Sequence, residues 1–234
     1  MRLRSPVTAI MAILAVVLLS VAKDFWEQPF TKWNNKEVVK MFEDSPWSQV
    51  QTFTKALGGK GSGMGGEKEV TWKYTIQFFS ALPIREAFVR MYQLRNNYDQ
   101  MSDDKRTEFD SRFKRALNLD VSNQVIVAFR YETNDPDGMR EVKRYLEEAT
   151  VDRLKQGVYL ISARLGRIDL KEYFPPAPDG TGAKFIFPRV VNDKPVVLPE
   201  DKEVKFDMWA PGAEERIFIT FKPARMVYKG QVAY

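Results

Sequence analysis

Three glycines in the stretch 58–66, which reads GGKGSGMGG, have the spacing of a dinucleotide-binding loop. Gly61, Gly63 and Gly66 match G-x-G-x-x-G, whose glycines let the backbone approach a pyrophosphate where a helix begins. The residues that follow, 67–79, alternate apolar and polar side chains as a strand does. Because the phosphate-binding loop requires a helix at this point, we interpret the glycines as a hairpin loop between two strands and expect no nucleotide cofactor.

Ser102 and Lys105 have the S-x-x-K spacing of serine acyl enzymes. No Ser-Asp-Asn or Lys-Thr-Gly motif follows, so the partners that this chemistry needs are missing. We therefore interpret Ser102 as the N-cap of a helix.

Residues 134–138 resemble half of a calcium loop. Asp135, Asp137 and Gly138 match the third, fifth and sixth positions, but Arg144 stands where a bidentate glutamate is required. We interpret the stretch as a turn that leads into a helix, and assign no metal ligand.

The chain contains 0 Cys and 0 His. These absences exclude disulfides, thiolate or imidazole metal sites, cysteine nucleophiles and Ser-His pairs. An enzyme of this composition would depend on carboxylates, Lys, Tyr or Arg. The linear sequence does not show which two carboxylates lie within the roughly 5 to 10 Å that glycoside hydrolysis requires. No catalytic, cofactor-binding or metal-binding residue is therefore assigned.

The first 22 residues have the layout of a cleaved signal peptide. Arg2 and Arg4 precede an apolar run over 10–21. The segment Ser20-Val21-Ala22 then has the small residues of a signal-peptide cleavage site. A membrane-spanning helix needs about 20 apolar residues, and this run is shorter. We expect cleavage after Ala22, export to the periplasm or the exterior, and no membrane span in the mature chain.

The region 23–66 is predicted to hold an aromatic leader, a short helix over 35–44, a strand near 50–57 and the glycine-rich loop. Asn34 and Glu37 have the spacing of a capping box. The expected buried positions of this region are Val38, Val39, Met41 and Phe42 on the helix and the tryptophans Trp26, Trp33 and Trp47.

The region 67–234 is predicted to form a single core. After the strand over 67–79, a helical pair begins at Pro83 and Ser102. The expected buried stripes are Ile84, Phe88, Met91, Arg95 and Tyr98 on the first helix and Phe109, Phe113, Ala116 and Leu117 on the second. A strand over 121–131 and a helix with Val142, Leu146, Ala149 and Leu154 inward follow.

The remaining chain has the pattern of successive short strands. They are expected over 158–163, 168–173, 185–191, 204–209, 217–221 and 226–233, with turns at 175–182, 192–195 and 210–213. The fold class that follows is α+β, mainly an antiparallel β sandwich or meander with a helical pair and one further helix packed on it.

The charge pattern does not favour nucleic acid. The formal net charge is +5, and cations and carboxylates alternate along the chain rather than collecting in one run. Even the region richest in arginine, 83–118, has acidic residues interleaved.

Three stretches carry a resemblance to a known group. They are Phe30-Thr31-Lys32-Trp33 through Asp44-Ser45-Pro46-Trp47, Ser80-Ala81-Leu82-Pro83-Ile84-Arg85-Glu86-Ala87, and Phe185-Ile186-Phe187-Pro188-Arg189. Together they resemble uncharacterised exported bacterial proteins, including relatives of the GWxTD-domain proteins, although the GWxTD string itself is absent. The resemblance implies a bacterial, envelope or extracellular setting and carries over no activity.

Two functions fit these observations. The first is an exported, non-enzymatic binding or structural protein of the cell envelope, whose partner is an envelope protein or glycan. The alternative is a carboxylate-dependent hydrolase that acts on an envelope polysaccharide or peptide.

The signal-peptide assignment predicts the N-terminus of the mature protein. N-terminal sequencing of protein purified from its native cells is expected to start at Lys23, because cleavage follows the segment Ser20-Val21-Ala22. A sequence that starts at Met1 in a cytosolic fraction would contradict export.

Overall fold

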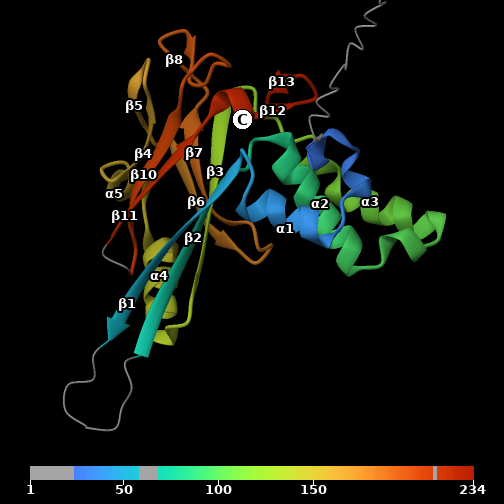
Figure 1. Ribbon diagram of the computed structural model, residues 1–234, viewed down its shortest axis with the longest axis horizontal. Coiled ribbons are helices and arrows are strands. Elements are labelled where there is room, and N and C mark those ends of the chain that lie inside the picture. The colour runs from blue at the N-terminus through green and yellow to red at the C-terminus, as the bar shows by residue number, and fades with distance from the viewer. Residues whose placement is uncertain (1–23, 58–67, 213–214) are drawn as a thin grey trace, which may run out of the picture.

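The computed structural model describes residues 24–57, 68–212 and 215–234. The leader that ends at Ala22 and the glycine-rich loop lie outside the described residues. The chain has an α+β fold in which every strand pairing is antiparallel, as the sequence predicts (Figure 1). Among the described residues, no helix is long and apolar enough to cross a membrane.

Two sheets form the framework of the fold. The larger has the order β1 (Ser48–Leu57), β2 (Lys68–Phe78), β3 (Gln124–Thr133), β7 (Gly182–Pro188) and β6 (Glu172–Ala177). The smaller has the order β11 (Glu215–Phe221), β10 (Val204–Ala210), β4 (Val158–Ser162) and β5 (Gly166–Asp169). Two small hairpins are β8 (Val190–Val191) with β9 (Lys194–Pro195), and β12 (Val227–Tyr228) with β13 (Gln231–Val232).

The helices cover both sides of the larger sheet. They are α1 (Asn35–Glu43), α2 (Leu82–Arg95), α3 (Asp103–Leu117), α4 (Pro136–Glu148) and the short α5 (Val151–Leu154). The group of α1, α2 and α3 lies on one side of the larger sheet, whereas the smaller sheet lies on the other side (Figure 1).

The alternation of side chains along β2 shows how the larger sheet divides these layers. Tyr74 donates a hydrogen bond to the carbonyl of Pro211 beside the smaller sheet, and the ring of Phe78 packs 4.7 Å from that of Phe221. Gln77 points the opposite way and donates to the carbonyl of Phe42 at the end of α1. Successive residues of a strand point to opposite faces. The strand β2 therefore packs one set of side chains against the smaller sheet and the other set against the helices.

The N-terminal region agrees with its prediction in most respects. Asn34 and Glu37 form the capping box at the start of α1. The predicted buried residues Val38, Met41, Phe42, Trp26, Trp33 and Trp47 are all buried. Val39 was expected in the buried stripe but is 52% exposed. The strand β1 pairs with β2 along ten residues, so the chain before the glycine-rich loop belongs to the same sheet as the chain after it.

The stripe predicted for α2 is confirmed at Ile84, which is buried, but not at its other positions. The helix ends at Arg95, which is exposed, and Phe88 and Met91 are only partly buried. Tyr98 falls in a separate 3-10 turn, Tyr98–Gln100. The buried polar residues of α2 are instead Arg85, Glu86, Arg90 and Gln93. The first three meet polar groups of neighbouring segments, whereas Gln93 accepts a hydrogen bond from Arg90 of the same helix.

Arg85 and Glu86 connect α2 to two distant parts of the chain. Arg85 donates to the carbonyls of Ala116 and Leu117 at the end of α3, at 2.9 and 2.8 Å. Glu86 accepts a hydrogen bond from the Tyr228 hydroxyl and lies 3.0 Å from Nζ of Lys229, both in the β12–β13 hairpin. These contacts attach α3 and the C-terminal hairpin to one helix.

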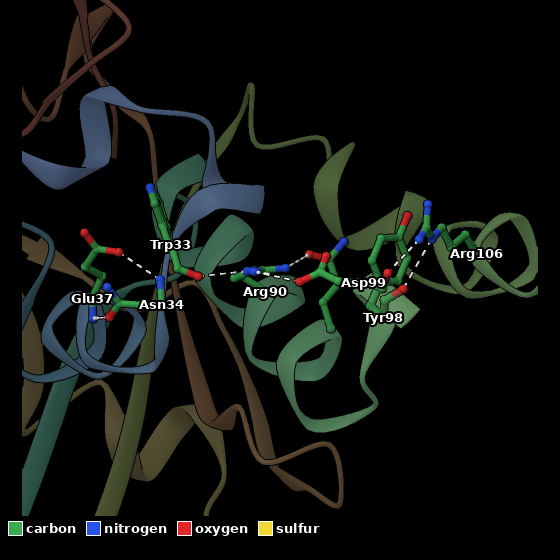
Figure 2. Close-up of polar contacts among 8 residues, drawn as sticks. Trp33, Asn34, Glu37, Arg90, Tyr98, Asp99 and Arg106 are labelled. Atoms are coloured by element: carbon green, nitrogen blue, oxygen red, sulfur yellow. Dashed lines mark hydrogen bonds and ion pairs between the residues drawn. The ribbon is translucent and has the colours of Figure 1, made fainter. Parts of the chain in front are cut away.

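Arg90 makes a third connection, to the aromatic leader. Its Nε donates to the carbonyl of Trp33 at 2.8 Å, and its terminal nitrogen lies 3.4 Å from Asp99 (Figure 2). The guanidinium of Arg106 on α3 donates to the Tyr98 and Asp99 carbonyls, so the chain between α2 and α3 is held from both helices (Figure 2).

Several other elements differ from their predicted form. The strand expected over 168–173 is interrupted and becomes the end of β5 and the start of β6. The strand expected over 226–233 is the β12–β13 hairpin, which follows a 3-10 turn at Pro223–Arg225. Leu154 is buried in α5, a helix separate from α4. Within the stripe predicted for α3, Phe109 alone is buried, because only one side of α3 rests on α2.

We expect Arg90→Met to lower the free energy of unfolding by about 1–3 kcal/mol, because the Trp33 carbonyl then loses its charged donor. Urea denaturation followed by tryptophan fluorescence measures the change. Arg112→Met is the control, because Arg112 is an exposed arginine of α3 paired with Glu108, and a change within about 0.5 kcal/mol is expected for it. Equal stability of the two variants would contradict the role of Arg90.

Candidate functional site

The outer surface of the smaller sheet carries a cluster of exposed aromatic side chains, which we call the aromatic face. On β10, the alternate residues Val204, Phe206, Met208 and Ala210 are buried in the core. The residues between them therefore point outward, as do their cross-strand partners. The aromatic face comprises Lys205, Asp207, Trp209, Arg216, Phe218, Thr220, Tyr159, Ile161, Arg167 and Asp169.

Trp209 and Phe218 are the most exposed aromatic rings of this face, at 63% and 45%. Arg216 lies directly opposite Trp209 in the β10–β11 ladder, and its guanidinium carbon is 5.5 Å from the centre of the Phe218 ring. The two exposed rings therefore flank one arginine.

A buried carboxylate holds that arginine in place. Nε of Arg216 donates to Asp207 at 2.7 Å, and a second guanidinium nitrogen also contacts Asp207. The same guanidinium reaches the Tyr159 hydroxyl at 3.1 Å. Hydrogen bonding and charge attraction from Asp207 raise the pKa of Arg216 above its ordinary value. The pair is bidentate, so Arg216 has one preferred orientation between the rings.

The other cations of the face also lie over rings and are paired. The guanidinium carbon of Arg167 is 4.1 Å from the Tyr159 ring centre, and Nζ of Lys205 is 5.4 Å from that of Phe218. Arg167 lies 2.6 Å from Asp169, and Lys205 lies 2.6 Å from Glu203. The aromatic face therefore combines exposed rings with nearly balanced charge.

The edge of the smaller sheet next to β11 is partly occupied by a side chain of β1. The amide of Gln51 accepts from the Phe218 backbone N–H and donates to the Arg216 carbonyl, each at 3.1 Å. A side chain that pairs with an edge strand reduces the backbone available to another strand. A partner of this sheet is consequently expected to contact its face rather than to extend it at β11.

The remaining exposed large apolar side chains are dispersed. They are Val39, Tyr145, Phe174, Val190 and Val227. In the described part of the chain, Trp209 and Phe218 are the two that lie on adjacent strands of the same sheet face.

Two carboxylates are buried among the described residues. The two buried ones, Glu86 and Asp207, are engaged by Lys229 and Arg216, respectively. Glu86 belongs to α2 and Asp207 to the aromatic face, so they lie on opposite sides of the larger sheet (Figure 1). Over residues 24–57, 68–212 and 215–234, no group of three or more acidic residues is placed to hold a metal ion.

The motifs that suggested chemistry have structural roles where they are described. Ser102 is the N-cap residue of α3, although its side chain makes no capping hydrogen bond, and both Ser102 and Lys105 are exposed. Asp135 caps α4 by accepting from the Asp137 N–H. Asn134 bonds to the backbone of both Glu69 and Thr71, which attaches this turn to β2.

Trp209 is not among the residues predicted from the sequence, although the pattern of β10 contains a signal for it. In Val204-Lys205-Phe206-Asp207-Met208-Trp209-Ala210, one face is entirely apolar. The other face places a tryptophan after a lysine and an aspartate, and a large ring on the polar side of a strand indicates a functional surface more than a core position.

No protein-family model, no curated protein and no solved structure matches the chain. The structure itself describes the protein as an α+β domain with an exposed aromatic sheet face.

Alanine substitutions can show whether residues of the aromatic face contribute to the free energy of unfolding as core residues do. We expect Trp209→Ala and Phe218→Ala to change the free energy of unfolding by no more than about 0.5 kcal/mol, because both rings are largely exposed. Phe206→Ala, on the buried side of β10, is expected to cost about 3–5 kcal/mol. Urea titration of the three variants measures these values. A large loss of stability for Trp209→Ala would assign this ring to the fold instead.

Proposed function

We propose that this chain is an exported, non-enzymatic protein of the bacterial cell envelope that binds a protein partner through the aromatic face. The observation that carries the proposal is the exposure of Trp209 and Phe218 on adjacent strands, with Arg216 held between them. Trp, Tyr and Arg are the residue types that contribute most to protein–protein binding energy.

The fixed geometry of the face supports binding. Arg216 is already held by Asp207 and Tyr159, and Arg167 is already paired with Asp169. A partner would therefore meet side chains that have lost most of their freedom before binding, which lowers the entropy cost of association. Because the cations are paired with carboxylates, the face favours an apolar and hydrogen-bonding partner over a polyanion.

The cellular setting is proposed from the sequence. The basic and apolar leader that ends at Ala22 and the resemblance to exported bacterial proteins support an envelope location. A domain without disulfides must be stabilised by its core, and the buried aromatic residues of both sheets provide one.

Site-specific photo-crosslinking in living cells tests the partner. A photoreactive amino acid at Thr220, which is exposed on the aromatic face, is expected to give a discrete crosslinked protein. The same group at Val190, exposed outside the face, is expected to give none. With purified partner, Trp209→Ala should weaken binding about 30-fold, the effect of a hot-spot residue worth about 2 kcal/mol.

Phe174→Ala is the matched control, because Phe174 is an aromatic side chain of the larger sheet with 53% exposure. It should leave affinity unchanged. Equal crosslinking from Thr220 and Val190, or no loss of affinity with Trp209→Ala, would refute the proposed surface. If the protein cosediments with purified cell-wall glycan and this binding requires Trp209, the partner is a glycan and not a protein.

A further inference from the structure

A pocket of about 260 Å³ lies on the opposite side of the larger sheet, between that sheet and α2. Its aromatic walls include Phe42, Phe79, Phe88 and Tyr92. The turn 178–181 between β6 and β7 forms another wall, and Tyr92 donates a hydrogen bond to the Asp179 carbonyl across it. The residues of α2 that the sequence assigned to the core, Phe88 and Met91, thus line a pocket instead.

Arg130 of β3 extends into the pocket lining from the sheet. Its neighbours Phe129 and Tyr131 point to the other face, so the alternation of the strand places the guanidinium on the helix side. The guanidinium carbon lies 5.4 Å from the Phe42 ring centre. Its buried Nε has no hydrogen-bond partner among the described residues, and burial lowers the pKa of Arg130.

A buried donor without an acceptor is costly, and more so when it belongs to a charged group. Glu43 and Glu132 lie near enough to favour the charged form of Arg130, but their ion pairs are with Lys73. Arg130 therefore lines the pocket with a guanidinium that has no ion pair of its own among the described residues.

Two more cations lie close to this site. Lys184 of β7 is only 19% exposed, contacts the Phe79 ring at 5.6 Å and donates to Thr181 at 2.5 Å. Burial lowers the pKa of Lys184, whereas the charge of Asp179, 3.9 Å away, raises it. Arg95 lines the pocket from the exposed end of α2. Arg95 and Arg130 thus line the pocket and Lys184 lies beside its wall, whereas Asp179 is the one carboxylate in the described lining.

We propose that this pocket binds a small organic anion, with its carboxylate or phosphate group on Arg130 and its apolar body against the aromatic walls. A planar guanidinium binds such oxyanions through directional, charge-assisted hydrogen bonds. The volume lies just below the range of small-molecule pockets, which starts at about 300 Å³, so the ligand is small. The pocket and the aromatic face lie on opposite sides of the larger sheet, so this site does not depend on the proposed function.

Calorimetric titration with benzoate and phenyl phosphate tests the site, with benzyl alcohol as the neutral probe of similar size. Wild-type protein is expected to bind both anions saturably and the alcohol at least tenfold more weakly. Arg130→Met should reduce anion affinity at least tenfold. Its melting temperature without ligand should be equal to or above that of wild type, because a buried donor without a partner has been removed.

The Nε–Hε resonance of Arg130 gives a second readout by NMR, because it belongs to the guanidinium that is proposed to bind the anion. This resonance is expected to shift on addition of benzoate and to be absent from the spectrum of Arg130→Lys. Arg140→Met, at an exposed arginine of α4, and Trp209→Ala should both leave anion binding intact. No saturable anion binding, equal binding of benzyl alcohol, or a lower melting temperature of Arg130→Met would each overturn the proposal.

Discussion

The arrangement of the helical layer depends on charged side chains that α2 buries. Burying an ion or guanidinium is costly unless partners compensate it, so each of these side chains favours particular polar groups beside it. Arg85 requires the carbonyls at the end of α3, Arg90 requires the Trp33 carbonyl, and Glu86 requires Tyr228 and Lys229. The helix α2 thereby connects the aromatic segment around Trp33, the helix α3 and the C-terminal β12–β13 hairpin.

The larger sheet separates two surfaces of different character. On its helix side, Arg130 and Lys184 are partly buried beside aromatic rings, with few acidic partners. Across the sheet, the aromatic face exposes its rings and pairs its cations with carboxylates. Unpaired buried charge favours a small charged ligand, whereas ordered exposed rings favour a macromolecule. The same domain can therefore present two independent binding sites.

Much of the fold could be predicted from local patterns. The capping box at Asn34 and Glu37, the alternation along β2 and β10 and the turn before α4 depend on neighbours in sequence, and each is present. The buried face of α2 could not be predicted in this way. An apolar stripe predicts burial against an apolar surface, but Arg85 and Arg90 are buried because distant carbonyls need donors. The sequence pattern of α2 contains no information about those carbonyls.

The candidate sites show the same division. The amino-acid sequence alone excludes the chemistry of histidine and cysteine, predicts the α+β class, and assigns Trp209 and Arg130 to one side of their strands. Tertiary contacts are needed to show that α2 and the turn 178–181 line a pocket with Arg130, whereas nothing among the described residues covers Trp209. The reason is physical: the period of a strand assigns a side chain to a face, but which layer packs on that face is decided by contacts between residues far apart in the chain.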